Sequence, residues 1–205
     1  MLIAFEGGEG AGKSTQIELL AQALRANGTS VTVTYEPGAT AVGAQIRKLL
    51  LETDAPIAPR SEALLFAADR AQHVATVIRP ALERGDVVIT DRFIDSSLAY
   101  QGAGRVLSTE DVKRLSRWAT EGLVPGLTVL LDVPAEVGLA RVERRRQGGQ
   151  DRLEREALDF HERVRTSFRA LAESEPDRYL VLDATRDPHE LASAVLARVT
   201  AVLDQ

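Results

Sequence analysis

The sequence contains no cysteine. A disulfide framework, a thiolate metal site and a cysteine nucleophile are therefore excluded, and the composition is consistent with a reducing cytoplasm. No apolar run approaches the roughly 20 residues that a membrane-spanning helix needs. Because the stretch after Met1 already has the pattern of a structural strand, we expect no signal peptide, no membrane association and a cytoplasmic location.

Lysine is also scarce, since only Lys13, Lys48 and Lys113 stand among the 25 Lys+Arg residues. Because lysine is rare, a lysine at a required position of a motif has a low chance of being there by coincidence. The 30 Asp+Glu residues outnumber the basic ones, and the net charge is -5 at pH 7. This charge argues against general electrostatic binding to nucleic acid, although a local basic pocket stays compatible with it.

The remaining composition is that of an ordinary globular protein. Of the 205 residues, 44% are hydrophobic and 27% are charged, which excludes a disordered or collagen-like chain. A chain of this length can bury about 70% of its unfolded surface. No linker rich in Pro, Gly or Ser divides it, so we predict a single domain over residues 1–205.

Short apolar or β-branched runs alternate with helical patterns along the chain. Strands are predicted for residues 2–5, 31–35, 87–90, 127–133 and 179–182. Helices are predicted for residues 13–26, 42–51, 61–84 (interrupted near Pro80), 94–101, 109–121, from 135, 151–172 and from 188. This alternation predicts an α/β fold, with a parallel sheet covered by helices on both faces.

A phosphate-binding motif follows the first predicted strand. Its pattern G-x-x-x-x-G-K-[ST] is matched by Gly7-Gly8-Glu9-Gly10-Ala11-Gly12-Lys13-Ser14. Glycines let successive N–H groups turn toward an anion, and the helix N-terminus adds a partial positive charge. Lys13 is predicted to reach the β- and γ-phosphates and Ser14 to bind Mg²⁺. We include Thr15 in this predicted nucleotide site.

The third predicted strand ends in Asp91, at the sheet edge where ligands bind in open α/β folds. An aspartate at a strand end is usually a helix cap or a turn residue. Beside a phosphate-binding loop, a role in holding Mg²⁺ together with Ser14 is favoured.

The motif alone does not say where the phosphate goes. A guanine-nucleotide switch normally carries Asn-Lys-x-Asp, but Asn27 is the only asparagine and no Asn-Lys pair exists. Signatures of a motor or transporter ATPase are also missing. Small kinases remain, and these need a second pocket for the phosphoryl acceptor.

Candidates for that pocket lie near the motif and on predicted helices. Arg92 directly follows Asp91 and is expected near the phosphates. Phe66 and Arg70 are four residues apart, so they share a helix face and could stack on a base and bond its carbonyl edge. Ser97 and Gln101 form a similar pair, and an amide can read an imide edge. Core packing of Phe66 and a salt bridge of Arg70 remain alternatives.

Several longer motifs stand at fixed spacing from the phosphate-binding loop. They are Glu36-Pro37-Gly38, Phe66-Ala67-Ala68-Asp69-Arg70, the run from Asp91 to Gly102, Leu131-Asp132-Val133 and Asp151-Arg152-Leu153-Glu154. Together they closely resemble the thymidylate kinase family, bacterial type, over roughly Leu2 to Ala201. The resemblance implies a P-loop fold with strand order 2-3-1-4-5, a homodimer, and phosphorylation of dTMP by ATP and Mg²⁺.

The resemblance also implies roles for individual residues. Phe66 stacks on thymine, Arg70 bonds a base carbonyl, and Ser97 and Gln101 read the remaining edge. Tyr100 packs against the deoxyribose. The 5′-phosphate of dTMP is bound by Arg47 and Arg92, while Glu9 faces the 3′-hydroxyl or neighbouring arginines and is supported by Glu36. Adenine lies near Arg141 and the loop around Arg186.

An arginine-rich segment at about 141–152 is predicted to be a lid. It contains Arg141, Arg144, Arg145, Arg146 and Arg152, and Gly148-Gly149 offers a flexible crossing. The phosphate-binding loop has no arginine, whereas phosphoryl transfer needs extra positive charge. We therefore predict Lys13, Arg92, Arg146 and Arg152 as catalytic, with a solvated helix face as the alternative for the lid arginines. Another small P-loop nucleotide or deoxynucleoside kinase is the alternative function, and a non-enzymatic nucleotide-bound module is a third reading.

Overall fold

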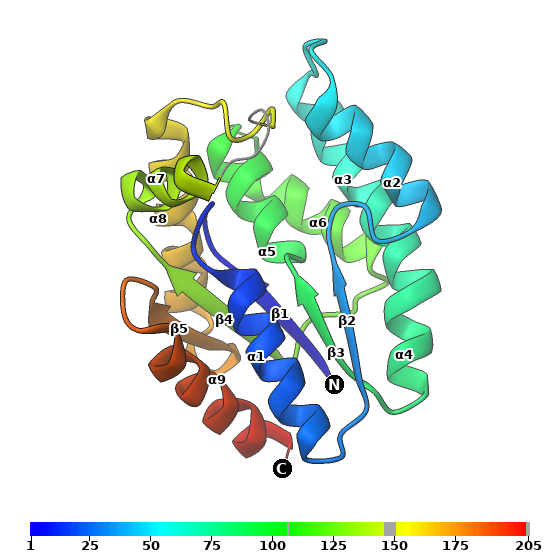
Figure 1. The fold of residues 1–205 in the computed structure, drawn as a ribbon. Coiled ribbons are helices and arrows are strands. Elements are labelled where there is room, and N and C mark those ends of the chain that lie inside the picture. Colours follow the sequence, from blue (N-terminus) through cyan, green and yellow to red (C-terminus); the bar gives the residue numbers. More distant parts are fainter. Residues whose placement is uncertain (106, 146–150, 204–205) are drawn as a thin grey trace.

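A computed structural model describes residues 1–105, 107–145 and 151–203. Its centre is a five-stranded parallel sheet with order β2-β3-β1-β4-β5, which confirms the predicted order. The strands are β1 (Leu2–Glu6), β2 (Val31–Tyr35), β3 (Val87–Asp91), β4 (Leu127–Asp132) and β5 (Tyr179–Asp183). Helices cover both faces of the sheet (Figure 1).

The helices alternate with the strands as the sequence predicts. Their bounds are α1 (Lys13–Ala26), α2 (Ala41–Arg47), α3 (Pro59–His73), α4 (Arg79–Glu83), α5 (Ile94–Ser97), α6 (Thr109–Ala119), α7 (Ala135–Arg145), α8 (Leu158–Ser174) and α9 (Pro188–Leu203). Wider π-helical turns at Lys48–Glu52, Val74–Ile78 and Leu98–Gly104 extend α2, α3 and α5, and a short 3₁₀ turn at Pro176–Arg178 precedes β5.

The predicted helix at 61–84 is interrupted one turn before Pro80. The α-helical pattern ends at His73 and gives way to the π-helical turn Val74–Ile78. Proline has no N–H to donate to the carbonyl four residues earlier, so the regular ladder cannot pass through this position unchanged. The break is therefore confirmed, and it extends further toward the N-terminus than the proline alone indicates.

The predicted start of a helix at residue 151 is wrong. Asp151 Oδ1 accepts hydrogen bonds from the backbone N–H groups of Leu153 and Glu154, both at 2.8 Å. Asp151 N–H donates in return to Glu154 Oε2 at 3.1 Å, which makes a capped turn, but this turn does not continue as a regular helix through residues 155–157. The regular helix α8 begins only at Leu158, and the preceding segment lies against the pocket as a turn.

The sheet centre is apolar because both of its faces are covered. Every residue of β1 is buried, and Ile3 and Phe5 pack with residues of α1 and α9 on one face. On the other face, residues of β1 and β3 pack against the α3–α4 region, and α8 packs against the π-helical turn that follows α5. The carboxyl ends of the strands converge at the edge drawn uppermost in Figure 1, where a binding site is expected.

Candidate active site

The glycine-rich loop after β1 is packed too closely for side chains. Gly10 has φ 67°, and a Cβ there would lie 2.1 Å from the carbonyl oxygen of Gly138 at the start of α7. A Cβ at Gly7, which has φ 138°, would likewise clash with the carbonyl oxygen of Leu131. No side chain caps the N-terminus of α1. The N–H groups of its first turn are therefore available to an anion.

Lys13 lies at the base of this loop and is buried. Its Nζ donates to the carbonyl oxygens of Gly7 and Gly8, both at 3.3 Å, and lies 4.0 Å from Asp91 Oδ1. Burial and the nearby charge of Arg92 lower the pKa of Lys13, while Asp91 and Glu9 oppose that shift. These bonds are long for N–H···O contacts. Among the described residues, the ammonium group thus has only long contacts, which leave it available to a phosphate.

Asp91 and Ser14 are the residues predicted to hold Mg²⁺, and both line the cavity. Asp91 Oδ1 is buried and accepts no hydrogen bond from the described part of the chain. No group of three or more His, Cys, Asp or Glu side chains that could hold a metal occurs among the described residues. Mg²⁺ usually takes one or two protein oxygens and completes its shell with waters and phosphates, so this sparse donor set fits.

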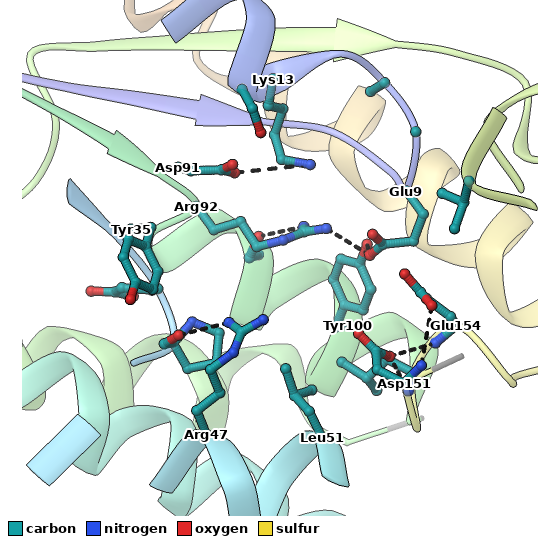
Figure 2. A pocket seen from close by; sticks show the side chains of 18 of the residues that line it. Glu9, Lys13, Tyr35, Arg47, Leu51, Asp91, Arg92, Tyr100, Asp151 and Glu154 are labelled. Atoms are coloured by element: carbon teal, nitrogen blue, oxygen red, sulfur yellow. Dashed lines mark hydrogen bonds and ion pairs between the residues drawn. The ribbon is translucent and has the colours of Figure 1, made fainter. Parts of the chain in front are cut away.

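Arg92 and Glu9 form an ion pair across the cavity (Figure 2). Arg92 Nη2 donates to Glu9 Oε1 at 2.6 Å, and Tyr100 OH donates to the same oxygen at 2.8 Å. The guanidinium carbon of Arg92 lies 4.9 Å from the centre of the Tyr100 ring. Burial alone would raise the pKa of Glu9, but the charges of Arg92 and Lys13 outweigh it and hold the pKa at about 2.

A buried carboxylate that sequence reasoning missed fixes the backbone around Arg92. Glu6 Oε1 accepts from the N–H groups of Phe93 (2.9 Å) and Ser96 (3.1 Å), and Ser96 Oγ donates to Oε2 at 2.6 Å. Arg92 itself has φ 70°, a left-handed conformation that non-glycine residues rarely adopt. Burial and the neighbouring Asp95 raise the pKa of Glu6 to about 7. The only sequence signal was an acidic residue ending an apolar strand.

The loop opens into one continuous cavity of about 810 Å³. The predicted acceptor residues that line it are Glu9, Glu36, Arg47, Phe66, Arg92, Ser97, Tyr100 and Gln101. They come from the strand ends, from α2 and α3, and from the segment that follows β3. Arg47 Nη1 donates to the Pro37 carbonyl at 2.8 Å, which holds its guanidinium beside the cavity. The structure thus brings phosphate-site and acceptor candidates into one space.

Arg70 differs from the other acceptor candidates because it lies behind the cavity wall. It is 1% exposed, and its Nε donates to Glu36 Oε2 at 2.8 Å. Its two terminal nitrogens donate to Ser97 Oγ and to the Phe93 carbonyl. His73, also unforeseen from the sequence, lies 2.9 Å from the second Glu36 oxygen. The salt-bridge alternative for Arg70 is therefore present, and its contact with a base stays a prediction.

The arginines of the predicted lid occupy different places. Arg141 lines the main cavity and donates to the Ala184 carbonyl at 3.0 Å, and a second cavity of about 460 Å³ lies between it and the loop containing Arg186. Arg186 pairs with Glu190 at 2.9 Å. Arg152 donates to the buried Glu62 and, at 2.7 Å, to the Leu50 carbonyl. Arg146 lies outside the described residues.

The model of the family described as thymidylate kinase matches residues 5–195. The chain belongs to the thymidylate kinase family. It is 52% identical over 203 residues to a thymidylate kinase of Clavibacter michiganensis subsp. michiganensis, covering 99% of this chain and 96% of the relative. It is 54% identical over 199 residues to one of Leifsonia xyli subsp. xyli, covering 97% and 94%.

A solved structure supports the same assignment. The crystal structure of thymidylate kinase from Ehrlichia chaffeensis superposes with a TM-score of 0.75 at 31% identity, covering 99% of this chain and 98% of the other. The expected P-loop fold and the resemblance to this family are confirmed, and as a thymidylate kinase family member the chain is an ATP-dependent kinase. No described helix is both long and apolar enough to cross a membrane.

Proposed function

We propose that this protein transfers the γ-phosphoryl group of ATP to the 5′-phosphate of dTMP, forming dTDP and ADP in the synthesis of dTTP. One observation carries the proposal. The single cavity joins Lys13 and the glycine-rich loop to an aromatic and amide pair, Phe66 and Gln101, that suits an imide base. Arg92 lies between the two halves, where a transferred phosphoryl group would be shared.

The donor half of the cavity suits ATP. Backbone N–H groups of the loop and the α1 N-terminus would hold the phosphates, with Lys13 at the β- and γ-positions. The cavity between Arg141 and the Arg186 loop would take the adenine. Asp91 and Ser14 would hold Mg²⁺, which when bound offsets negative charge on the β- and γ-phosphate oxygens.

The acceptor half suits a deoxynucleoside monophosphate. Phe66 offers a face for stacking, and Ser97 with Gln101 offers polar groups to the base edge. Arg47 and Arg92 supply positive charge for the 5′-phosphate. Tyr100 and Glu9 stand where the sugar would pass, so that their contacts disfavour a 2′-hydroxyl and favour a 3′-hydroxyl.

The reaction needs positioning and charge rather than a proton acceptor. The dTMP phosphate is already largely anionic at pH 7, so one of its oxygens can attack the γ-phosphorus in line while the bond to ADP breaks. Lys13 and Arg92 are placed to stabilise the charge of the transferring group. A lid arginine, Arg146 or Arg152, completes this charge in our proposal, and lid closure keeps water out.

We also propose a homodimer that forms through α3 and α6. Leu64 on α3 is 58% exposed, and Trp118 on α6 is 81% exposed, although large apolar side chains are usually covered. The two helices pack against each other, and Trp118 lines one surface pocket together with Ala71 of α3. Leu64 is seven residues before Ala71, so it lies on the same face of α3. Analytical sedimentation tests this proposal. We expect the wild type to sediment as a dimer and Trp118→Glu as a monomer. A monomeric wild type contradicts the proposal.

A coupled ADP-release assay tests the proposed reaction. We expect fast Mg²⁺-dependent release with dTMP, slower release with dUMP, and little with dCMP, dAMP, dGMP or thymidine. A preference for thymidine would indicate a deoxynucleoside kinase instead. Failure to release ADP with any acceptor would indicate a nucleotide-bound module without kinase activity.

A further inference from the structure

Glu62 on α3 is a fully buried carboxylate that four hydrogen-bond donors surround. Gln101 Nε2 donates to Oε1 at 3.0 Å, and Arg105 donates to both oxygens at 3.2 and 3.1 Å. The fourth donor is Arg152 Nη2, from the end of the predicted lid segment. Burial would raise the pKa of Glu62, but the bonds from Arg105, Gln101 and Arg152 outweigh it and lower the pKa. Glu62 is therefore ionised at neutral pH.

This ionised carboxylate determines how the Gln101 amide is turned. A carboxylate only accepts hydrogen bonds, so it can face the amide nitrogen but not the amide oxygen. The reversed amide would oppose two oxygens in a buried place, at the cost of an unpaired polar group. Gln101 lines the cavity beside Ser97 and Phe66. The bond to Glu62 uses one of the two Nε2 protons and holds the nitrogen on the Glu62 side, so Oε1 is the amide atom that is turned away from Glu62 and can accept from a base.

We propose that Glu62 is a positioning residue that sets base specificity by presenting Gln101 Oε1 as a hydrogen-bond acceptor. The proposal rests on the function proposed above. An acceptor at this point bonds the N3–H of an imide base, such as thymine or uracil. It rejects a base whose N3 carries no proton, which includes cytosine and the N3-deprotonated form of an imide.

Arg105 and Arg152 take part by keeping Glu62 charged. Arg105 Nη1 also lies 2.6 Å from Glu156 Oε1, so it is anchored on a second side. A buried carboxylate with two arginines can also serve only to join α3 to neighbouring segments. The two roles differ in one measurable respect: a structural clamp has no reason to distinguish the protonation states of a bound base.

The test uses 5-bromo-dUMP, whose N3 proton is more acidic than that of dTMP. In the wild type, kcat/KM for 5-bromo-dUMP should fall as the pH rises through the N3 pKa of this analogue. The same measurement with dTMP over the same pH range corrects for ionisations of the enzyme. In Glu62→Gln the neutral amide can donate as well as accept, so Gln101 can turn its nitrogen toward deprotonated N3. At the alkaline end, the ratio of 5-bromo-dUMP to dTMP kcat/KM should rise roughly three- to tenfold over the wild-type ratio, the scale of one hydrogen bond.

Two further variants separate positioning from structure. Arg105→Gln removes two donors from Glu62 but leaves the Gln101 bond and the Arg152 ion pair, which keeps Glu62 ionised. This variant should therefore lower stability and keep the wild-type pH profile. In a Gln101→Met background, Glu62→Gln should change the profile no further, because the amide it acts through is gone. If Glu62→Gln does not fold, the charge-balanced Glu62→Gln/Arg105→Gln variant takes its place.

The outcomes are distinct. A folded, active Glu62→Gln or double variant with the wild-type pH profile overturns the role of Glu62 and leaves the proposed reaction intact. A wild-type enzyme that does not phosphorylate dTMP overturns the proposed reaction itself. An effect of Glu62→Gln that persists in the Gln101→Met background also contradicts the proposal, because it would not act through that amide.

Discussion

The guanidinium of Arg92 lies 2.6 Å from the carboxylate of Glu9, so the charge nearest the proposed transfer point is paired before substrates bind. Arg92 comes from the end of β3 and Glu9 from the loop after β1, and both line the cavity. A phosphate would compete with Glu9 for the guanidinium. Glu9 thus keeps a half-buried cation compensated in the free enzyme and positions it toward the phosphates.

Arg92→Met should lower kcat roughly 10²- to 10³-fold, the scale for losing one preorganised charge contact to the transition state. Tyr100→Phe is the matched control, because it removes the other donor to Glu9 without changing any charge. We expect that control to lose less than tenfold in kcat. Steady-state kinetics with both substrates provides the measurement, and equal losses in the two variants would refute a charge role for Arg92.

Lys13→Ala should lower kcat by roughly 10²-fold or more, since the ammonium group reaches the transferring phosphoryl group in the proposed reaction. Lys48→Ala is the matched control, because Lys48 lies in the π-helical turn after α2 and does not line the cavity. Its kcat should stay near that of the wild type. Near-normal turnover of a folded Lys13→Ala protein would contradict the phosphate-binding role assigned to this loop.

Arg70→Ala should destabilise the protein and should also weaken the binding of dTMP. Removing the guanidinium leaves the buried Glu36 without its 2.8 Å partner, which typically costs about 3–5 kcal/mol in the free energy of unfolding. If Arg70 also bonds the base, KM for dTMP should rise far more than KM for ATP, by the equivalent of about 1.5–3 kcal/mol. Urea unfolding and KM values check the two effects separately, and equal changes in both KM values would indicate a purely structural residue.

Glu6 should make the folded state less stable as pH rises. Its pKa is raised from an ordinary 4.5 to about 7, so the unfolded chain loses this proton first. The stability contribution is fully present below pH 4.5 and is lost up to about pH 7. Glu6→Gln imitates the protonated form. Its free energy of unfolding should decline less over this range than that of the wild type, by about 1 kcal/mol or more, and parallel curves from urea unfolding would contradict the assigned shift.

Local patterns in the sequence were enough for the strands, their alternation with helices and the phosphate-binding loop, whereas the strand order was predicted from the resemblance to the thymidylate kinase family. Glycines, an apolar strand and a helix start are all determined by neighbouring residues. The burial of Glu6 and Glu62 was not predicted, because an acidic residue at a strand end or in the first turn of a helix is usually exposed to solvent. Their burial depends on distant partners, such as Arg105 and Arg152 for Glu62, and single-sequence patterns do not specify such contacts.

Of the two lid arginines that were predicted together as catalytic, the structure describes only Arg152. Arg152 is joined to Glu62 and to the Leu50 carbonyl, on the side of the cavity that would receive the base. Arg146 lies outside the described residues, and its contact with the γ-phosphate stays a prediction from the sequence. The two side chains therefore have different expected effects, and their kinetic constants can distinguish them.

Arg152→Ala should mainly raise KM for dTMP, because it removes one donor from Glu62 and loosens the wall that holds Gln101. Arg146→Ala should mainly lower kcat, because a contact formed chiefly in the transition state does not weaken substrate binding. Arg144→Ala is the control for the effect of charge on kcat, since Arg144 is exposed and donates to the Ala140 carbonyl of its own helix. Arg144 also lines the cavity proposed for adenine, so this variant should change KM for ATP rather than kcat. Steady-state kinetics of the three folded variants decides between these roles.

If Arg144→Ala loses as much kcat as Arg146→Ala, the segment acts as a diffuse basic surface. If Arg152→Ala instead lowers kcat with an unchanged KM, Arg152 must leave Glu62 during turnover and act on the phosphates.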